Sequence, residues 1–133
     1  MGVLGIGGIF FRSKDPQGLA DWYKTHLGIG GGCVAEGTGE TPNEWVWATT
    51  AGPLVFQPFK EDSDYFPAEK QVMLNLRVSD LAGLCEQLRA AGVEVITKEE
   101  WDSMPEIGRF ARIHDPEGNP IELWEPAAAA PAA

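Results

Sequence analysis

The chain has few cysteines, few histidines and few basic residues, and each shortage argues against a class of function. Among its 133 residues are two cysteines and two histidines. With no CxxC spacing, two cysteines argue against a disulfide framework, and we expect both thiols to be reduced. Ten Lys and Arg residues stand against 20 Asp and Glu, for a formal net charge of −10. So acidic a chain lacks the clustered positive charge that binds phosphates, and we expect neither a nucleic-acid nor a membrane partner.

Long apolar runs are also missing. No segment is long and apolar enough to cross a bilayer, and the start does not read as a secretory signal, so we expect a cytoplasmic protein. The apolar fraction of 44% and the charged fraction of 23% are ordinary for a globular protein. The length fits one compact domain, which we expect over residues 1–126, with a flexible alanine-rich tail at 127–133.

A pattern of helix signals occurs twice, about half the chain apart. Asp15-Pro16 begins a predicted helix that Gly28 ends, and Asp80 begins another that Gly92 ends. Aspartate is a good N-cap, proline suits the first helical position, and glycine suits the left-handed conformation after the last turn. The two halves of the chain are therefore predicted to share one local design.

Strand-like segments flank both predicted helices. They lie at 8–13, 43–49 and 53–58, with a further one around 33–35, and in the second half at 73–78, 93–97, 110–113 and 121–124. Each half thus reads as a strand, a helix and two or three more strands. We expect an α+β fold of two βαβββ modules, at about 5–60 and 70–126, whose curved mixed sheets surround a central cavity with the helices outside.

The run from Asp115 to Pro126, DPEGNPIELWEP, is the most informative stretch. Its first half has the composition of a tight turn, since Pro presets φ and both Gly and Asn tolerate positive φ. Its second half alternates, so that Glu122 and Trp124 face one side of a strand. A carboxylate inside an apolar strand either faces solvent or lines a cavity where its charge is used.

These segments resemble the vicinal oxygen chelate superfamily, which contains glyoxalase I, bleomycin-resistance proteins, fosfomycin-resistance enzymes and extradiol dioxygenases. The shared marks follow the family's order: Phe11 to Pro16 with Trp22-Tyr23, then Val78 to Leu81, then Asp115 to Leu123. The resemblance implies the paired-module fold and pairing into a homodimer. It says less about activity, because one fold hosts several chemistries.

Metal-dependent members of that superfamily place one ligand on each of four strands. The corresponding positions here are Gly8, Val55 (or Gln57 if the register slips by two), Met73 and Glu122. A divalent cation generally needs at least three oxygen or nitrogen ligands, and a thioether favours soft metals instead. We therefore predict no metal ion and no other cofactor.

Strand alternation predicts which side chains face the cavity. The predicted ligand-binding residues are Phe10, Arg12, Trp45, Trp47, Gln57, Met73, Asn75, Arg77, Phe110, Arg112 and Trp124, beside Glu122. Arginine forks and aromatic walls together would suit a planar organic anion. Two alternatives stay open: Arg77 or Arg112 forms a structural salt bridge with Glu122, and Trp45 and Trp47 are ordinary packing.

The segment between the two halves, Glu61 to Pro67, reads as a solvated crossover, although its aromatic residues could close over the cavity. Three functional hypotheses follow. The first is a glyoxalase/bleomycin-resistance-like protein that binds a small organic molecule without metal. The second is a lyase or isomerase of glyoxalase I type, with Glu122 as catalytic general base or metal ligand. The third is an interaction module with a vestigial cavity.

Overall fold

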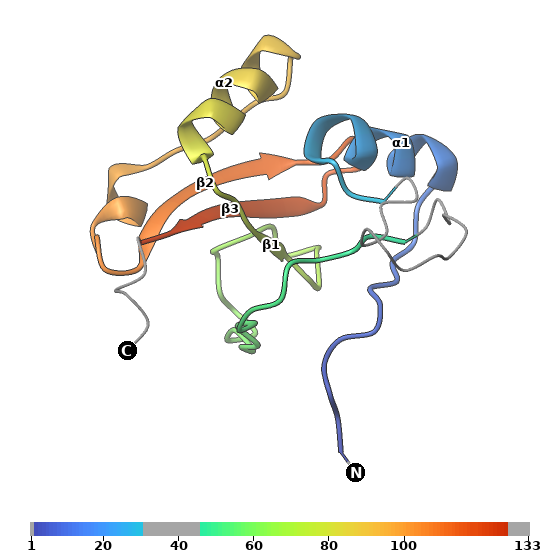
Figure 1. Ribbon diagram of the computed structural model, residues 1–133, viewed down its shortest axis with the longest axis horizontal. Helices are drawn as coiled ribbons and strands as arrows, with labels where there is room; N and C mark the ends of the chain where they lie inside the picture. Colours follow the sequence, from blue (N-terminus) through green and yellow to red (C-terminus); the bar gives the residue numbers. More distant parts are fainter. Residues whose placement is uncertain (1, 31–45, 128–133) are drawn as a thin grey trace. The chain divides into compact units, whose positions relative to one another are not determined.

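The computed structural model describes residues 2–30 and 46–127 (Figure 1). The chain divides into two compact units, Met1–Trp47 and Ala48–Ala133. The predicted strand around 33–35 and the side chain of Trp45 lie outside the described residues. None of the helices in the two described ranges has the length and apolar character that crossing a bilayer requires.

The first unit contains the helix α1 (Pro16–Leu27), with the ends that the sequence predicts. Asp15 caps it, because its carboxylate accepts a hydrogen bond from the backbone N–H of Gly18 at 3.1 Å. Gly28 ends it with a φ of 67°, the left-handed conformation that glycine adopts without strain. On its inner face Tyr23 is buried, and the rings of Phe11 and Trp22 pack against it edge-on.

The second unit contains the helix α2 (Leu81–Ala90), which begins in the same way. The Asp80 carboxylate accepts a hydrogen bond from the Gly83 N–H at 3.1 Å. The backbone of Asp80 has φ −144° and ψ 82°, against −144° and 81° for Asp15. The two halves of the chain therefore use one and the same helix start, as their shared pattern predicts.

A three-stranded mixed sheet follows in the second unit, in the order β1-β3-β2 (Figure 1). Parallel pairing joins β1 (Leu74–Arg77) to β3 (Pro120–Pro126), and antiparallel pairing joins β3 to β2 (Gly108–His114). The short 3₁₀ helix η1 (Glu99–Asp102) precedes β2. Two helices and a small mixed sheet confirm the α+β class.

The predicted turn at Asp115 joins β2 to β3, and one buried carboxylate organises it. Asp115 accepts hydrogen bonds from the backbone N–H of Glu117 at 2.9 Å and of Asn119 at 3.0 Å, and from the Asn119 amide at 2.7 Å. Gly118 has a φ of +81°, which explains glycine at that position. The turn fixes the register in which β2 meets β3.

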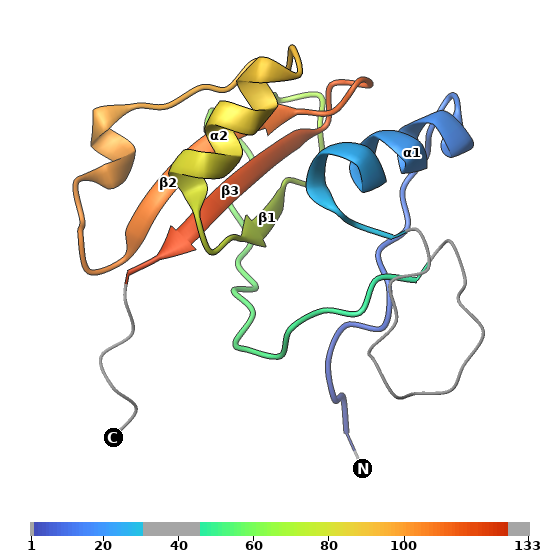
Figure 2. The same ribbon diagram turned by 45° about the horizontal axis from the view of Figure 1, so that its top comes forward.

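The two faces of the sheet differ in character. On one face Ala111, Ile113, Ile121 and Leu123 are fully buried, and Leu88 of α2 belongs to the same core. Figures 1 and 2 show α2 on one side of the sheet and the segment that precedes β1 on the other. The face opposite α2 is therefore the one on which polar side chains collect.

The predicted strands of the first half do not form in residues 2–30 and 46–127. The segments 8–13 and 53–58 contain no strand, and the side chains of Phe10 and Phe56 are 94% and 86% exposed. A strand needs a neighbour to take its backbone hydrogen bonds, and neither segment pairs with a strand among the residues that the structure describes. In the second half, the segment 93–97 is reduced to a single bridge between Ile96 and Arg112. The two βαβββ modules and their cavity stay predictions.

Candidate functional site

Six of the predicted ligand-binding and catalytic residues lie together on the sheet face opposite α2. Strand pairing sets them in two rows across β1, β3 and β2. The first row is Asn75, Glu122 and Arg112, and the second is Arg77, Trp124 and Phe110. Residues in register across neighbouring strands point to the same side of a sheet, so three separate strands supply this two-row face.

Glu122 lies at the centre of the first row and is 8% exposed. Its Oε1 accepts a hydrogen bond from the Asn75 amide at 2.7 Å, and its Oε2 accepts one from the hydroxyl of Tyr65. Both donors are neutral groups. In the described structure Glu122 is therefore held by an amide and a phenol, and not by the salt bridge with Arg77 or Arg112 that was one of the alternatives. Hydrogen bonds to both oxygens stabilise the charge of a buried carboxylate.

Arg112, beside Glu122 in the same row, is 6% exposed. Its Nη2 donates to the backbone oxygen of Tyr65 at 3.1 Å. The guanidinium carbon lies 5.0 Å from the ring centre of Tyr65 and 5.5 Å from that of Trp101. Two aromatic rings therefore stabilise this buried cation. Its Nε is buried and has no hydrogen-bond partner in the described part of the chain.

Tyr65 connects these two charged groups. Burial, together with the hydrogen bond to Glu122 and the charge of that carboxylate, raises the pKa of its phenol to about 12, although Arg112 acts in the opposite direction. The phenol therefore stays protonated at neutral pH and acts as a donor. Its ring also packs against Phe59, with ring centres 5.7 Å apart, and against Trp101 at 6.3 Å.

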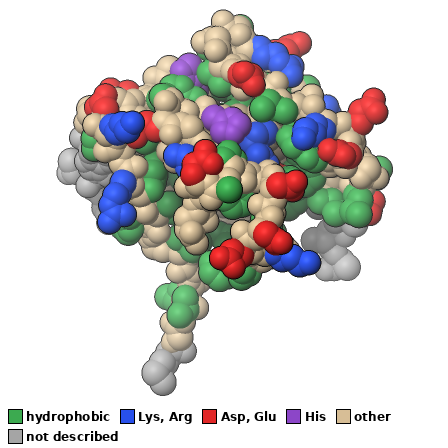
Figure 3. All heavy atoms as spheres, turned by 180° about the vertical axis from the view of Figure 1, so that it is seen from behind, with side chains coloured by type: hydrophobic (Ala, Val, Ile, Leu, Met, Phe, Trp, Pro, Cys, Tyr) green, Lys and Arg blue, Asp and Glu red, His purple; other side chains and the backbone are tan. Residues whose placement is uncertain are grey.

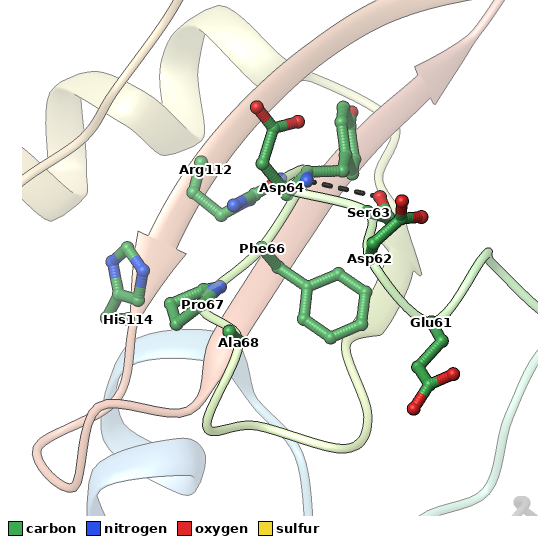
Figure 4. Close-up of a pocket in the computed structure, with 10 residues that line it drawn as sticks. Glu61, Asp62, Ser63, Asp64, Phe66, Pro67, Ala68, Arg112 and His114 are labelled. Atoms are coloured by element: carbon green, nitrogen blue, oxygen red, sulfur yellow. Dashed lines mark hydrogen bonds between the residues drawn. The ribbon is translucent and has the colours of Figure 1, made fainter.

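A hollow of about 470 Å³ lies beside this contact. Residues 61–68 line it along one side, and Arg112 and His114 reach it from β2 (Figure 4). Three of the lining residues are the exposed carboxylates Glu61, Asp62 and Asp64. The hollow is thus acidic at its solvent side and has a buried arginine in its wall.

The second row is more apolar. The rings of Phe110 and Trp124 stack in parallel, 4° apart in orientation and with their centres separated by 6.1 Å. The Trp124 indole donates to the backbone oxygen of Ile107 at 2.9 Å, which fixes the ring. Arg77 donates to the backbone oxygen of Thr50 at 2.8 Å. A flat aromatic wall therefore adjoins the polar first row.

The other predicted site residues are not part of the two-row face as the structure describes it. Phe10, Arg12 and Trp47 belong to the first unit, and Trp45 lies outside the described residues. Gln57 is exposed in the second unit, and Met73 is half-buried next to β1. Sequence reasoning did not place Tyr65 and Trp101 in the site. The aromatic pair after the acidic run was the only signal for Tyr65.

The residues around Glu122 do not fit a divalent cation. Both carboxylate oxygens accept hydrogen bonds, and the neighbouring groups are an amide, a phenol and a guanidinium. A guanidinium beside the carboxylate opposes a second cation electrostatically. Residues 2–30 and 46–127 contain no group of three His, Cys, Asp or Glu side chains placed to hold a metal.

Charge on the face drawn in Figure 3 is mixed. Lys and Arg side chains are interspersed there with Asp and Glu, and the described residues form no broad basic patch on that face.

Comparison with known proteins decides the family. The sequence profile of the glyoxalase-like domain matches residues 8–124. The chain belongs to the glyoxalase-like domain family. This confirms the resemblance to the vicinal oxygen chelate superfamily.

A solved structure shows the same glyoxalase-like fold. It is TnmS3, an antibiotic-binding protein from Streptomyces sp. CB03234, with 21% sequence identity and a TM-score of 0.55. The similarity covers 95% of this chain and 98% of TnmS3. At that identity the likeness shows the fold alone. Among curated proteins, none is similar enough in sequence to match.

Proposed function

We propose that this glyoxalase-like protein binds a small, planar organic molecule without a metal ion. The observation that carries the proposal is the two-row face, where a buried carboxylate and a buried arginine adjoin the stacked rings of Phe110 and Trp124. Ligand sites commonly combine apolar walls with a few fixed polar groups, and this face has both. TnmS3 is an antibiotic-binding protein, so an antibiotic or a related metabolite is the ligand class to test first.

The proposal includes a single domain over residues 1–126, built of two βαβββ modules around one cavity. The first module, at about 5–60, would add Phe10, Arg12, Trp45, Trp47 and Gln57 to the cavity, and the second, at about 70–126, would add Met73. Two observations support this arrangement: the identical helix starts at Asp15 and Asp80, and the family match that spans both halves.

We further propose a homodimer. The apolar side chains of Leu54, Val55 and Phe56 are more than half exposed, and such a group is typical of a surface that another chain covers. Residence in the cytoplasm stays a prediction of the sequence.

The alternative of a lyase or isomerase has less support. Glu122 is 8% exposed, and the side chains of Asn75 and Tyr65 donate to its two oxygens, so a substrate would reach the carboxylate only after one of these donors moved. Turnover of a glutathione hemithioacetal that is lost in Glu122→Gln would reverse this ranking.

Thermal denaturation tests the proposal with a panel of planar antibiotics and aromatic metabolites, and separately with zinc and nickel. A ligand that binds the folded state raises the melting temperature. We expect at least one organic compound to do so, and neither metal. Arg112→Lys keeps the charge but loses the fork, and should abolish the shift. Arg109→Lys makes the same change at an exposed position on the other face of β2 and should keep it.

A further inference from the structure

Tyr65 contacts the two-row face through three different groups, two of its side chain and one of its backbone. Its hydroxyl donates to Glu122, its ring lies under the guanidinium of Arg112, and its backbone oxygen accepts from Arg112. A hydroxyl, an aromatic ring and an acceptor oxygen are also what a small hydroxylated aromatic molecule would offer. Tyr65 thus makes the contacts that such a molecule would need at this place.

The surroundings of the Tyr65 ring are those of an aromatic binding site. Trp101 and Phe59 flank it at 6.3 Å and 5.7 Å between ring centres, and the guanidinium of Arg112 lies 5.0 Å from its centre. The guanidinium lies over the ring, Phe59 meets it edge-on and Trp101 is tilted against it. Such an arrangement can hold any planar aromatic group of this size, since the attraction depends on the ring and not on the backbone that carries it.

One hydrogen-bond donor at the site lacks an acceptor among the described residues. The Nε of Arg112 is buried and has no partner in the part of the chain that the structure describes. A buried N–H without an acceptor is costly, and such groups are rare in native proteins. Tyr65 therefore satisfies this arginine incompletely, and a molecule with a second oxygen could satisfy it better.

The segment that carries Tyr65 is irregular and lies beside an open hollow. Residues 61–68 form neither a helix nor a strand, and Glu61, Asp62, Asp64 and Ala68 are exposed. The hollow of about 470 Å³ lies between this segment and β2 (Figure 4). Among the described residues, the segment 61–68 forms hydrogen bonds to the sheet only through Tyr65. The hydroxyl of Tyr65 donates to Glu122, and its backbone oxygen accepts from Arg112.

We propose that Tyr65 is a built-in substitute for the ligand, and that the ligand is a hydroxylated aromatic molecule with an acceptor oxygen. This rests on the proposed function. When the ligand binds, the side chain of Tyr65 leaves the face. The hydroxyl of the ligand then donates a hydrogen bond to Glu122, and the ring of the ligand packs against Arg112 and Trp101. The acceptor oxygen of the ligand accepts a hydrogen bond from the Nε of Arg112.

Removal of Tyr65 should therefore strengthen binding, because the ligand no longer competes with it. The probe is para-hydroxybenzoate, which has a ring, a hydroxyl donor and a carboxylate, and its affinity is measured by NMR titration. We expect Tyr65→Ala to bind it about tenfold more tightly than the wild type or better, since a competing closed state lowers apparent affinity by the fraction that is closed. Circular dichroism confirms that each variant is folded.

Three controls isolate the hydroxyl contact. Para-methoxybenzoate has no hydroxyl donor and should gain nothing from Tyr65→Ala. Glu122→Gln in the Tyr65→Ala background replaces a charged acceptor by a neutral one and should remove most of the gain. Tyr65→Phe keeps the competing ring but not its anchor, and should give a smaller gain than Tyr65→Ala.

The outcomes separate this inference from the proposed function. If Tyr65→Ala binds para-hydroxybenzoate no more tightly than the wild type, or gains equally for the methoxy compound, Tyr65 is not a substitute for the ligand. If Tyr65→Ala weakens binding, Tyr65 is a wall of the site, and the inference is again overturned. In both cases a planar compound that stabilises the wild type through Arg112 would leave the proposed function intact.

Discussion

The hydroxyl of Tyr65 donates a hydrogen bond to Oε2 of Glu122, across 57 positions of the sequence. The contact joins the segment before β1 to the central strand of the sheet. It gives the buried carboxylate its second donor, beside the Asn75 amide. The ring of the same tyrosine lies 5.0 Å from the guanidinium carbon of Arg112, so one side chain contacts both charged residues of the first row.

Tyr65→Phe should lower the free energy of unfolding at neutral pH by about 1 to 3 kcal/mol, since it removes a hydrogen bond to a charged acceptor. Chemical denaturation measures this. Equal stability of Tyr65→Phe and wild type would mean that the contact with Glu122 contributes nothing.

The same contact predicts a dependence on alkaline pH. The folded state raises the pKa of Tyr65 from 10.0 to about 12. A group with a raised pKa contributes fully below its unfolded pKa, and its contribution is lost as pH rises through the folded one. The stability difference between wild type and Tyr65→Phe should therefore shrink as pH rises from about 10 towards about 12. The chain has two tyrosines, so tyrosinate absorbance of wild type minus variant reports Tyr65 directly.

The turn at Asp115 should be sensitive to the loss of its carboxylate. Asp115→Ala leaves the N–H groups of Glu117 and Asn119 without their acceptor and should cost about 1 to 3 kcal/mol of unfolding free energy. Asp115→Asn keeps one acceptor oxygen and should lose less. Urea denaturation of the three proteins checks the order, and an alanine variant as stable as wild type would contradict it.

The core between α2 and the sheet predicts a contrast between two leucines. Leu88 is 1% exposed, whereas Leu4 is fully exposed. Leu88→Ala leaves a cavity and should cost about 2 to 5 kcal/mol, whereas Leu4→Ala makes the same chemical change and should stay within about 0.5 kcal/mol. Thermal denaturation compares them. A similar loss at both positions would contradict this account of the core.

The start of α2 provides a smaller test. Asp80→Ala removes the acceptor of the Gly83 N–H and should cost about 1 kcal/mol. Asp80→Asn keeps a side-chain oxygen and should be close to wild type in urea denaturation. A loss in the asparagine variant as large as in alanine would show that the charge, and not the cap, stabilises the helix.

Local signals in the sequence predicted several elements well. Asp15 and Gly28 gave both ends of α1, Asp80 gave the start of α2, and the DPEGN run gave the turn before β3. Each of these features depends on contacts between residues only a few positions apart in the sequence. The alternation around Glu122 also placed it on a shared face with Asn75 and Arg112, because strand parity is a local property.

The contacts of Tyr65 could not be predicted in that way. Its partners Glu122 and Arg112 lie in strands about half the chain away, and no period or cap in the sequence relates them. Trp101 was not predicted for the same reason, because only the tertiary structure brings η1 next to Tyr65 and Arg112. The described structure contains no strand at 8–13 or 53–58. The sequence could not decide this, because alternation shows which residues could form a strand but not which neighbour pairs with it.

Native mass spectrometry of the protein purified from its own organism tests the central claim most directly. The account predicts an organic molecule bound to the folded chain, no stoichiometric metal, and loss of that molecule in Arg112→Lys but not in Arg109→Lys. Zinc or nickel bound in a one-to-one ratio, and lost in Glu122→Gln, would contradict it.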